Sequence, residues 1–300
     1  MAFVNLPETA TIIEVGPRDG LQNEANFVPT EQKVAFIQSL FNSGFREMEV
    51  TSFVSPKWVP QMSDAAEVME YVSHYDKTIV LTPNQRGVEA ALQAGAKSVA
   101  VFLGVSSTFN QKNINRTTEE ALKGLHPVIK ELKMQGIFVR ACISTAFHCP
   151  YEGAVDPDDT LALCQAFYEM GVDELSVADT IGKATPKESF ALFSKLKEEL
   201  PGILLTAHFH DTRKMALANI YAALLAGINR FDSSAGGLGG CPFAPGASGN
   251  VATEDVVYML HEMGIETGIN LDSLVKSIDI IKPYVSRELS SWYYREHQKA

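Results

Sequence analysis

The stretch GVDELSVADTIGKATPKE, residues 171–188, carries the signals of one complete strand-to-helix unit. Gly171 ends a helical pattern, and an apolar run over residues 175–178 follows within a few positions. After a short polar segment, the sequence TPKE at residues 185–188 is a capping box with proline at the first helical position. The stretch therefore predicts a strand, a polar loop at its carboxyl end and a new helix.

The same pattern, a glycine at the end of a helix followed by an apolar run, recurs along the chain. Glycine suits the left-handed position just past a helix end, and five glycines precede strand-like runs: Gly44, Gly95, Gly136, Gly171 and Gly227. Eight such apolar runs span residues 12–15, 48–51, 78–81, 99–103, 139–143, 175–178, 204–208 and 231–233. Because strands that alternate with helices form a parallel sheet, these eight units predict an α/β fold of the closed (β/α)8 type, a TIM barrel.

The predicted barrel accounts for nearly all of the 300 residues. We expect one TIM-barrel domain over residues 1–300, with the barrel at about 11–265 and a short C-terminal helical extension at about 270–300. A doubly wound open sheet is the alternative, and it is disfavoured because no G-x-G-x-x-G sequence follows the first predicted strand. In the helix expected after residues 204–208, the stripe predicted to face the core consists of Met215, Ala218, Ala222 and Leu225.

Composition excludes several classes of partner. Lys plus Arg total 25 against 36 Asp plus Glu, a net charge of −11, and no basic block offers the phosphate contacts that nucleic-acid binding needs. No apolar run approaches the roughly 18 residues of a membrane helix. The first ten residues hold no Lys or Arg, so no signal or transit peptide is expected. Four cysteines in 300 residues do not form a disulfide framework, which fits a cytoplasmic protein.

Polar side chains gather where predicted strands end, which is where TIM barrels build their active sites. His208 and His210 are two residues apart on an extended segment, so both rings point to the same face. They form either a metal site or a hydrogen-bonded pair near a turn, and acids at other strand ends favour the metal site. Asp19 is the expected oxygen ligand, although in isolation it is typical of a turn. Asn250 either offers a neutral oxygen or caps the next helix, and a mixed nitrogen and oxygen set favours Mg²⁺ or Mn²⁺.

A fixed cation is expected beside this metal site. Arg18 precedes Asp19, and a guanidinium there would stabilise developing oxyanion or enolate charge. Glu49 is an acid inside an otherwise apolar run, so it needs a partner if it is buried. A salt bridge between Arg18 and Glu49 is the alternative role for Arg18, and it is compatible with catalysis.

A glycine-rich segment follows the last predicted strand. Residues 236–249 contain six of the 21 glycines, which indicates a mobile loop over the barrel mouth or backbone that closely approaches a ligand. Cys241 lies within this segment. Its thiol could act as an acid, a base or a redox-sensitive group, or the residue could be an incidental small one.

Six further motifs are EVGPRDGLQNE at residues 14–24, TSFVSPKWVPQM at 51–62, KNIN at 112–115, CPYE at 149–152, DTIG at 179–182 and the loop from 236 to 255. Together they resemble the 3-hydroxy-3-methylglutaryl-coenzyme A lyase family over the segment from residue 11 to residue 270. That family belongs to a group of metal-dependent barrel lyases named for an Asp-Arg-Glu trio. Asp19, Arg18 and Glu49 match the trio.

The resemblance implies a set of site residues and a reaction. The metal ligands would be Asp19, His208, His210 and Asn250, with Mg²⁺ or Mn²⁺ as the cofactor. Arg18 and Gln22 would bind substrate, and the catalytic residues would be Arg18, Glu49, Asp179 and Cys241. The reaction would be metal-assisted retro-Claisen cleavage of 3-hydroxy-3-methylglutaryl-CoA to acetoacetate and acetyl-CoA. The enzyme would be a homodimer that binds an acyl-CoA and neither nucleic acid nor membrane.

The chain departs from the family pattern at two places near the barrel mouth. Arg213-Lys214 follow the histidine pair where Tyr-Gly or Arg-Gly is expected, and His148 stands where glycine is more usual. A related lyase for a longer 3-hydroxy-3-substituted-glutaryl-CoA therefore stays an alternative. A Claisen-type synthase joining an acyl-CoA to a 2-oxo acid is another, although such chains usually carry an extra C-terminal region. A non-catalytic barrel is disfavoured by the complete set of site residues.

Overall fold

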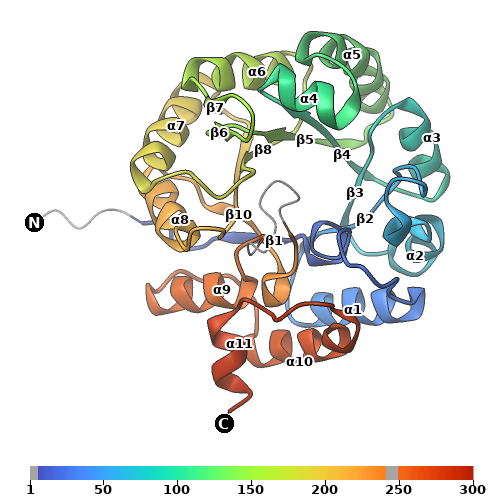
Figure 1. Cartoon of the computed structure of the whole chain (residues 1–300), viewed down its shortest axis with the longest axis vertical. Helices are drawn as coiled ribbons and strands as arrows, with labels where there is room; N and C mark the ends of the chain where they lie inside the picture. Colours follow the sequence, from blue (N-terminus) through green and yellow to red (C-terminus); the bar gives the residue numbers. More distant parts are fainter. Residues whose placement is uncertain (1–5, 241–248, 300) are drawn as a thin grey trace, which may run out of the picture.

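Eight parallel strands form a closed barrel in the computed structural model, which describes residues 6–240 and 249–299. Their order around the barrel is β1, β10, β9, β8, β5, β4, β3 and β2, so that β1 closes the ring between β10 and β2 (Figure 1). The strands are β1 (Thr11–Glu14), β2 (Glu47–Ser52), β3 (Lys77–Leu81), β4 (Ser98–Gly104), β5 (Phe138–Ser144), β8 (Glu174–Asp179), β9 (Leu204–Phe209) and β10 (Arg230–Ser233). The predicted TIM barrel is confirmed, and each of the eight predicted runs overlaps one of these strands.

Helices surround the barrel, as Figure 1 shows. They are α1 (Thr30–Asn42), α2 (Ala65–Val72), α3 (Gln85–Gln93), α4 (Ser107–Ile114), α5 (Thr118–Met134), α6 (Pro157–Glu169), α7 (Pro186–Glu199), α8 (Ala216–Leu225), α9 (Thr253–Glu262), α10 (Leu271–Ile281) and α11 (Trp292–His297). The short helical turns are η1 (Gly16–Gly20), η2 (Pro60–Met62), η3 (Ala235–Gly237) and η4 (Lys282–Tyr284). Helix α10 packs against α1, so the C-terminal helices lie against the start of the barrel. Within the described segments, no helix combines the length and apolar character of a membrane span.

Helix ends follow the sequence signals. Thr117 and Thr185 form complete capping boxes with Glu120 and Glu188, at the starts of α5 and α7. The five glycines that were expected just past helix ends all have positive φ, between 72° and 109°. These local features were therefore predicted correctly, because they depend on residues close together in the chain.

One small element and one helix face differ from expectation. A hairpin of β6 (His148–Cys149) and β7 (Gly153–Ala154), which we did not predict, lies between β5 and α6. In α8 the expected stripe is only partly buried, because Ala222 is buried but Ala218 is exposed, and the helix also buries Ala216, Ile220 and Ala223. The sequence ALANIYAALL is apolar on almost every side, so its periodicity defines the buried face only weakly.

The barrel interior contains a group of paired charges. Arg230, Glu47 and Glu174 each begin a strand, and Arg230 Nη2 lies 2.5 Å from Glu47 and 3.4 Å from Glu174. Arg140 on β5 also approaches Glu174, at 3.6 Å, and donates to Asp232 on β10. TIM barrels usually fill this space with branched apolar side chains. Because buried charges are tolerated only when they are paired, each member of this group depends on its own partner.

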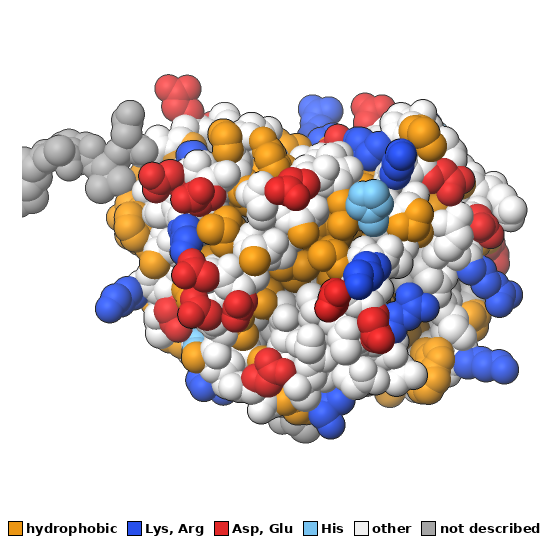
Figure 2. Space-filling view, turned by 90° about the horizontal axis from the view of Figure 1, so that it is seen from above, with side chains coloured by type: hydrophobic (Ala, Val, Ile, Leu, Met, Phe, Trp, Pro, Cys, Tyr) orange, Lys and Arg blue, Asp and Glu red, His pale blue; other side chains and the backbone are white. Residues whose placement is uncertain are grey.

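The surface in Figure 2 mixes acidic and basic side chains with apolar ones. This face presents no continuous basic surface, and the chain as a whole carries a net charge of −11. A phosphate backbone would therefore find little favourable potential on this face.

The glycine after α1 tests how tightly the C-terminal helices are docked. A Cβ on Gly44, whose φ is 109°, would collide with the carbonyl oxygen of Gly268, just before α10. Gly136, with φ of 72°, has open space around it. We expect Gly136→Ala to cost about 1–2 kcal/mol of left-handed backbone strain and Gly44→Ala to cost clearly more. Urea unfolding measures the free energy of unfolding of both variants. An equal decrease in the two would show that the contact with Gly268 does not restrict residue 44.

Candidate active site

Polar residues from separate segments meet at the carboxyl-terminal mouth of the barrel. The ligand atoms of Asp19 in η1, His208 in β9 and His210 just after β9 lie within 4.8 Å of one another, and we call these three residues the Asp19 group. Asn250 joins them, because its Nδ2 donates to Asp19 Oδ2 at 2.7 Å and its backbone bridges to His210. The four residues predicted to bind a metal therefore come together.

The π-helical turn η1 carries Arg18 and Asp19 to this mouth. The backbone N–H groups of Arg18, Asp19 and Gly20 all donate to the carbonyl of Val15, which winds the turn tightly after β1. A Cβ on Gly20 would lie 2.8 Å from the side chains of both Leu238 and Ser234, so glycine is needed there. The turn thus packs directly on the segment that follows β10.

His208 is oriented by a carboxylate. Its Nδ1 lies 3.1 Å from Oδ2 of Asp232, on the neighbouring strand β10. Burial alone would raise the pKa of Asp232, but the charges and hydrogen bonds of Arg140 and His208 together outweigh burial and hold this pKa well below its usual range. For His208, burial lowers the pKa, whereas the hydrogen bond and charge of Asp232 raise it, and the net direction is upward.

His210 and Asn250 have unused ligand atoms. Burial and the neighbouring His208 lower the pKa of His210 to about 4, so its ring is neutral at pH 7. Among the described residues, neither the buried Nδ1 of His210 nor the buried Oδ1 of Asn250 finds a hydrogen-bond partner. Buried polar atoms normally have a partner, and with the Asp19 carboxylate these atoms form a nitrogen and oxygen set that suits a divalent cation such as Mg²⁺ or Mn²⁺. Asn250 is not the cap of the next helix, since α9 begins after Ala252.

Arg18 lies between two carboxylates. Its Nε donates to Glu49, which confirms the expected salt bridge, and its Nη1 donates to Asp19 Oδ1 at 2.7 Å. Gln22 Nε2 donates to the same Asp19 oxygen at 3.0 Å. Burial would raise the pKa of Asp19, but Arg18 and then the two histidines lower it below its usual range. A guanidinium and an ionised oxygen ligand are therefore fixed side by side.

Asp179 and Cys241 are the remaining residues predicted to be catalytic. Asp179 ends β8, and its carboxylate oxygens accept from the backbone N–H groups of Lys183 and Ala184, each at 2.9 Å. Both oxygens are thus used to order the loop before α7, and the catalytic role of Asp179 stays a prediction. Cys241 lies outside the described residues.

The residues that depart from the family pattern lie beside this same loop. His148 Nε2 is 3.0 Å from Glu188 Oε1, in the first turn of α7. Arg213 Nη1 donates to the carbonyls of Ile181 and Gly182 at 3.0 and 3.2 Å, and Lys214 pairs with Asp211. His148 and Arg213 therefore brace the loop between β8 and α7.

Sequence reasoning missed three buried acids behind the site. Asp232 and Glu14 each stand inside a predicted strand, which is the signal that identified Glu49, so both were open to prediction. Glu254 lies in the first turn of α9, where an acid is ordinary, and no sequence signal distinguishes it.

Glu14 ties together the backbone behind the site. Its Oε1 accepts from the N–H groups of Gly16 and Ala235 at 2.7 and 2.9 Å, and its Oε2 accepts from Thr253 Oγ1 at 2.7 Å. It thereby connects η1, η3 and the start of α9. Burial raises the pKa of Glu14 to about 8 and the pKa of Glu254 to about 7.

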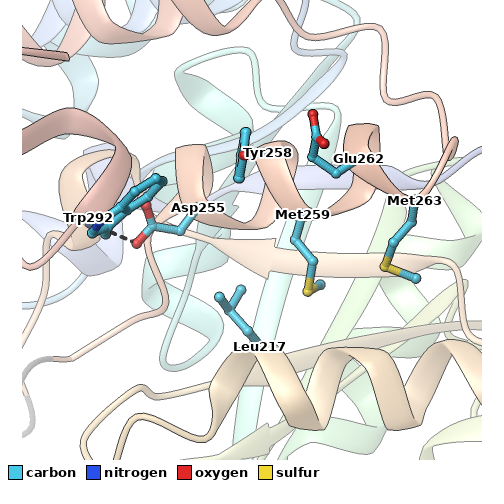
Figure 3. Close-up of a pocket in the computed structure, with 7 residues that line it drawn as sticks. All are labelled: Leu217, Asp255, Tyr258, Met259, Glu262, Met263 and Trp292. Atoms are coloured by element: carbon cyan, nitrogen blue, oxygen red, sulfur yellow. Dashed lines mark hydrogen bonds between the residues drawn. The ribbon is translucent and has the colours of Figure 1, made fainter. Parts of the chain in front are cut away.

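An apolar groove lies on the outer helices. Figure 3 shows Leu217 of α8 facing Met259 of α9, with Trp292 of α11 at one end. Asp255 accepts a hydrogen bond from the backbone N–H of Trp292 at 3.0 Å. The residues that line the groove do not include the Asp19 group, so the two features are separate.

In sequence, the chain is similar to hydroxymethylglutaryl-CoA lyases. The profile of the HMGL-like family matches residues 9–281. The mitochondrial hydroxymethylglutaryl-CoA lyase of Arabidopsis thaliana is 48% identical over 94% of this chain, which spans 61% of the length of that protein. The hydroxymethylglutaryl-CoA lyase YngG of Bacillus subtilis is 45% identical over 95% of this chain and 96% of its own length.

Solved structures show the same similarity. The hydroxymethylglutaryl-CoA lyase of Pseudomonas aeruginosa superposes with a TM-score of 0.95 at 42% identity, covering 99% of this chain and 100% of that one. An HMG-CoA lyase of Acinetobacter baumannii, in complex with coenzyme A and 3-methylmalate, gives a TM-score of 0.91 at 36% identity over 98% and 96% of the two chains.

Glu14 makes the stability of the chain depend on pH in a defined direction. Its pKa is raised from 4.5 to about 8 by folding, so the folded state holds this proton more tightly than the unfolded state. The contribution of Glu14 to the free energy of unfolding therefore falls as pH rises through this window and is constant above it. In Glu14→Gln the group no longer titrates, so we expect a smaller fall, measured by urea unfolding at about pH 5, 7 and 9.

The matched control is Glu70→Gln, which removes an exposed acid on α2. Its pH dependence should follow that of the unchanged chain. A difference between Glu14→Gln and the unchanged chain that is the same at every pH would contradict the prediction.

Proposed function

The chain belongs to the HMGL-like family, and we propose that it cleaves 3-hydroxy-3-methylglutaryl-CoA to acetoacetate and acetyl-CoA. It is a carbon–carbon lyase of the hydroxymethylglutaryl-CoA lyase type, as relatives 45% and 48% identical over nearly its whole length are. One observation in the structure carries the proposal. The Asp19 group gathers its ligand atoms within 4.8 Å, with the Arg18 guanidinium 2.7 Å from Asp19.

The HMGL-like family is metal-dependent, and the residues of this chain fit a divalent cation. We propose Mg²⁺ or Mn²⁺, held by Asp19, His208, His210 and Asn250. When bound, such a cation supplies Lewis-acid chemistry, lowering the pKa of a substrate hydroxyl and stabilising negative charge on oxygen.

The bond changes are those of a retro-Claisen cleavage. The C3 hydroxyl loses its proton to a base, the C2–C3 bond breaks, and C3 becomes the ketone carbon of acetoacetate. The electron pair of the broken bond passes to C2 and the thioester carbonyl, which gives the enolate of acetyl-CoA. A proton delivered to C2 completes acetyl-CoA.

Arg18 stabilises the negative charge on the thioester oxygen of this enolate. Its guanidinium is already held by Glu49 and Asp19, so it needs little reorganisation when the charge develops. Glu49 acts by fixing Arg18, and it is 1% exposed. Gln22 keeps Asp19 oriented through its 3.0 Å hydrogen bond and lies at the mouth, where we expect it to contact substrate.

We assign the protonation of C2 to Cys241, on the glycine-rich segment that follows β10. A thiol can carry a proton to the enolate, and general acid catalysis of this kind contributes about 10²–10⁴-fold. Asp179 contributes by ordering the loop between β8 and α7, through its bonds to Lys183 and Ala184.

An acyl-CoA substrate is supported by the complex of the Acinetobacter baumannii lyase with coenzyme A, which aligns over 98% of this chain. The net charge of −11 is compatible with an anionic thioester, because Arg18 and the bound cation would supply positive charge at the mouth. A cytoplasmic homodimer is our proposal for its location and assembly. The cysteine content supports the cytoplasmic location, and the family resemblance supports the homodimer.

The reaction is tested with the purified chain, Mg²⁺ or Mn²⁺ and 3-hydroxy-3-methylglutaryl-CoA, with acetoacetate as the measured product. We expect cleavage that is lost on chelation, restored by either cation and abolished in His208→Ala. Full activity in His208→Ala, or no acetoacetate, would contradict the proposal. Cleavage only of a longer 3-substituted thioester would change the substrate, and condensation of acetyl-CoA with a 2-oxo acid would indicate a synthase.

Arg18→Gln tests the charge that stabilises the enolate. Since a preorganised donor to a developing oxyanion contributes roughly 10²–10³-fold to kcat, we expect a fall of that size. Arg295→Gln is the control, because Arg295 is half-exposed on α11 and pairs only loosely, at 3.8 Å, with Glu288. Steady-state kinetics should show the same kcat for Arg295→Gln and the unchanged chain. If Arg18→Gln also had the kcat of the unchanged chain, the role of Arg18 in stabilising the enolate would be excluded.

A further inference from the structure

We propose that Asp232 is a positioning residue, whose carboxylate accepts the Nδ1 proton of His208 and so presents Nε2 of that ring to the Asp19 group. The two residues are paired in register on the adjacent strands β9 and β10, and Nδ1 lies 3.1 Å from Oδ2. This inference rests on the metal site of the proposed function and assigns a role to a residue outside the ligand set.

The chemistry of the pair selects one tautomer. An ionised carboxylate has no proton to donate, so the ring nitrogen that faces it must carry one. The lone pair of a neutral His208 then lies on Nε2, on the opposite side of the ring. Carboxylates placed in this way behind a ligating histidine fix both its tautomer and its orientation.

Asp232 is itself held in place by donors from three strands. Arg140 of β5 donates to its carboxylate, Ser176 of β8 donates to Oδ2 at 2.8 Å, and His208 of β9 completes the set. The side chain is 3% exposed, and Arg140 is fully buried. The carboxylate therefore cannot rotate away from His208, and its hydrogen bond fixes the orientation of the His208 ring.

His210 provides an internal contrast. Its buried Nδ1 has no hydrogen-bond partner within the described segments, so no acceptor holds that nitrogen as Asp232 holds Nδ1 of His208. The two histidines of the Asp19 group thus differ in preorganisation. His208 is fixed before a cation arrives, whereas His210 gains its remaining contact from the ligand.

Asp232→Asn should reverse the tautomer. Because Arg140 can only donate, the carbonyl oxygen of the new amide faces Arg140, and the amide NH₂ turns toward His208. Nδ1 must then accept, the ring proton moves to Nε2, and the lone pair no longer faces the Asp19 group. We expect the Kd for Mn²⁺ to rise about 10- to 100-fold, the usual cost of losing such a partner.

The matched control is Glu47→Gln. This substitution removes the same charge from a similarly buried ion pair, since Glu47 is 6% exposed and bonded to Arg230, but it makes no contact with His208. If Asp232 served stability alone, both variants would lower the unfolding midpoint and leave Mn²⁺ affinity unchanged. We expect both to lower the midpoint and only Asp232→Asn to weaken Mn²⁺ binding.

Two measurements on the full chain carry the test. Isothermal titration with Mn²⁺ alone gives Kd for the unchanged chain and both variants. Long-range ¹H–¹⁵N spectra of the metal-free chain, assigned with His208→Gln, report the tautomer of His208 without any ligand, so the proposal remains testable if Asp232→Asn does not fold.

The inference is supported by an Nδ1–H tautomer in the unchanged chain together with selective loss of Mn²⁺ affinity in Asp232→Asn. An Nε2–H tautomer, or an equal Kd in Asp232→Asn and the unchanged chain, would overturn it and leave the proposed function standing. Failure of the unchanged chain to bind Mn²⁺ would overturn the metal site and this inference together.

Discussion

Arg140 and Asp232 meet inside the barrel, where Arg140 is fully buried and Asp232 is nearly so. An unpaired charge at such a depth costs several kcal/mol, so the closed barrel requires the ion pair between these two residues. Their pairing joins β5 to β10 across the interior. Through Asp232 it also sets the position of His208, so one contact that stabilises the barrel also shapes the candidate active site.

The rest of the interior extends the same constraint. Arg140 approaches Glu174, and Glu174 and Glu47 share Arg230 at the opposite end of the barrel from the site. Replacing this group with aliphatic side chains would avoid the cost of desolvation, and it would also remove the partner that orients His208. The barrel therefore places one buried carboxylate, Asp232, where the candidate chemistry uses it, and pairs its other interior charges with one another.

The candidate site was largely accessible from sequence. The spacing of His208 and His210 placed both rings on one face, and the position of Asp19 and Arg18 after the first strand brought them to the same mouth. Asp232 was missed, even though it stands inside a predicted strand as Glu49 does, because its significance lies in a partner 24 residues away. The buried face of α8 was predicted only in part, since a helix that is apolar all round carries little information about its orientation.

The sequence by itself determined the eight barrel strands, their alternation with helices, the glycine ends of those helices and the family, because these depend on short-range patterns and long motifs. Only the tertiary structure decided which polar atoms meet. Asn250 reaches Asp19 across 231 positions, and Glu14 reaches Thr253 across 239, because β1 closes the barrel against β10. Such contacts depend on the register of strands far apart in the chain, and no local pattern encodes that register. The same closure left Nδ1 of His210 and Oδ1 of Asn250 buried without a partner in the described chain, which is the strongest structural sign of a cation site.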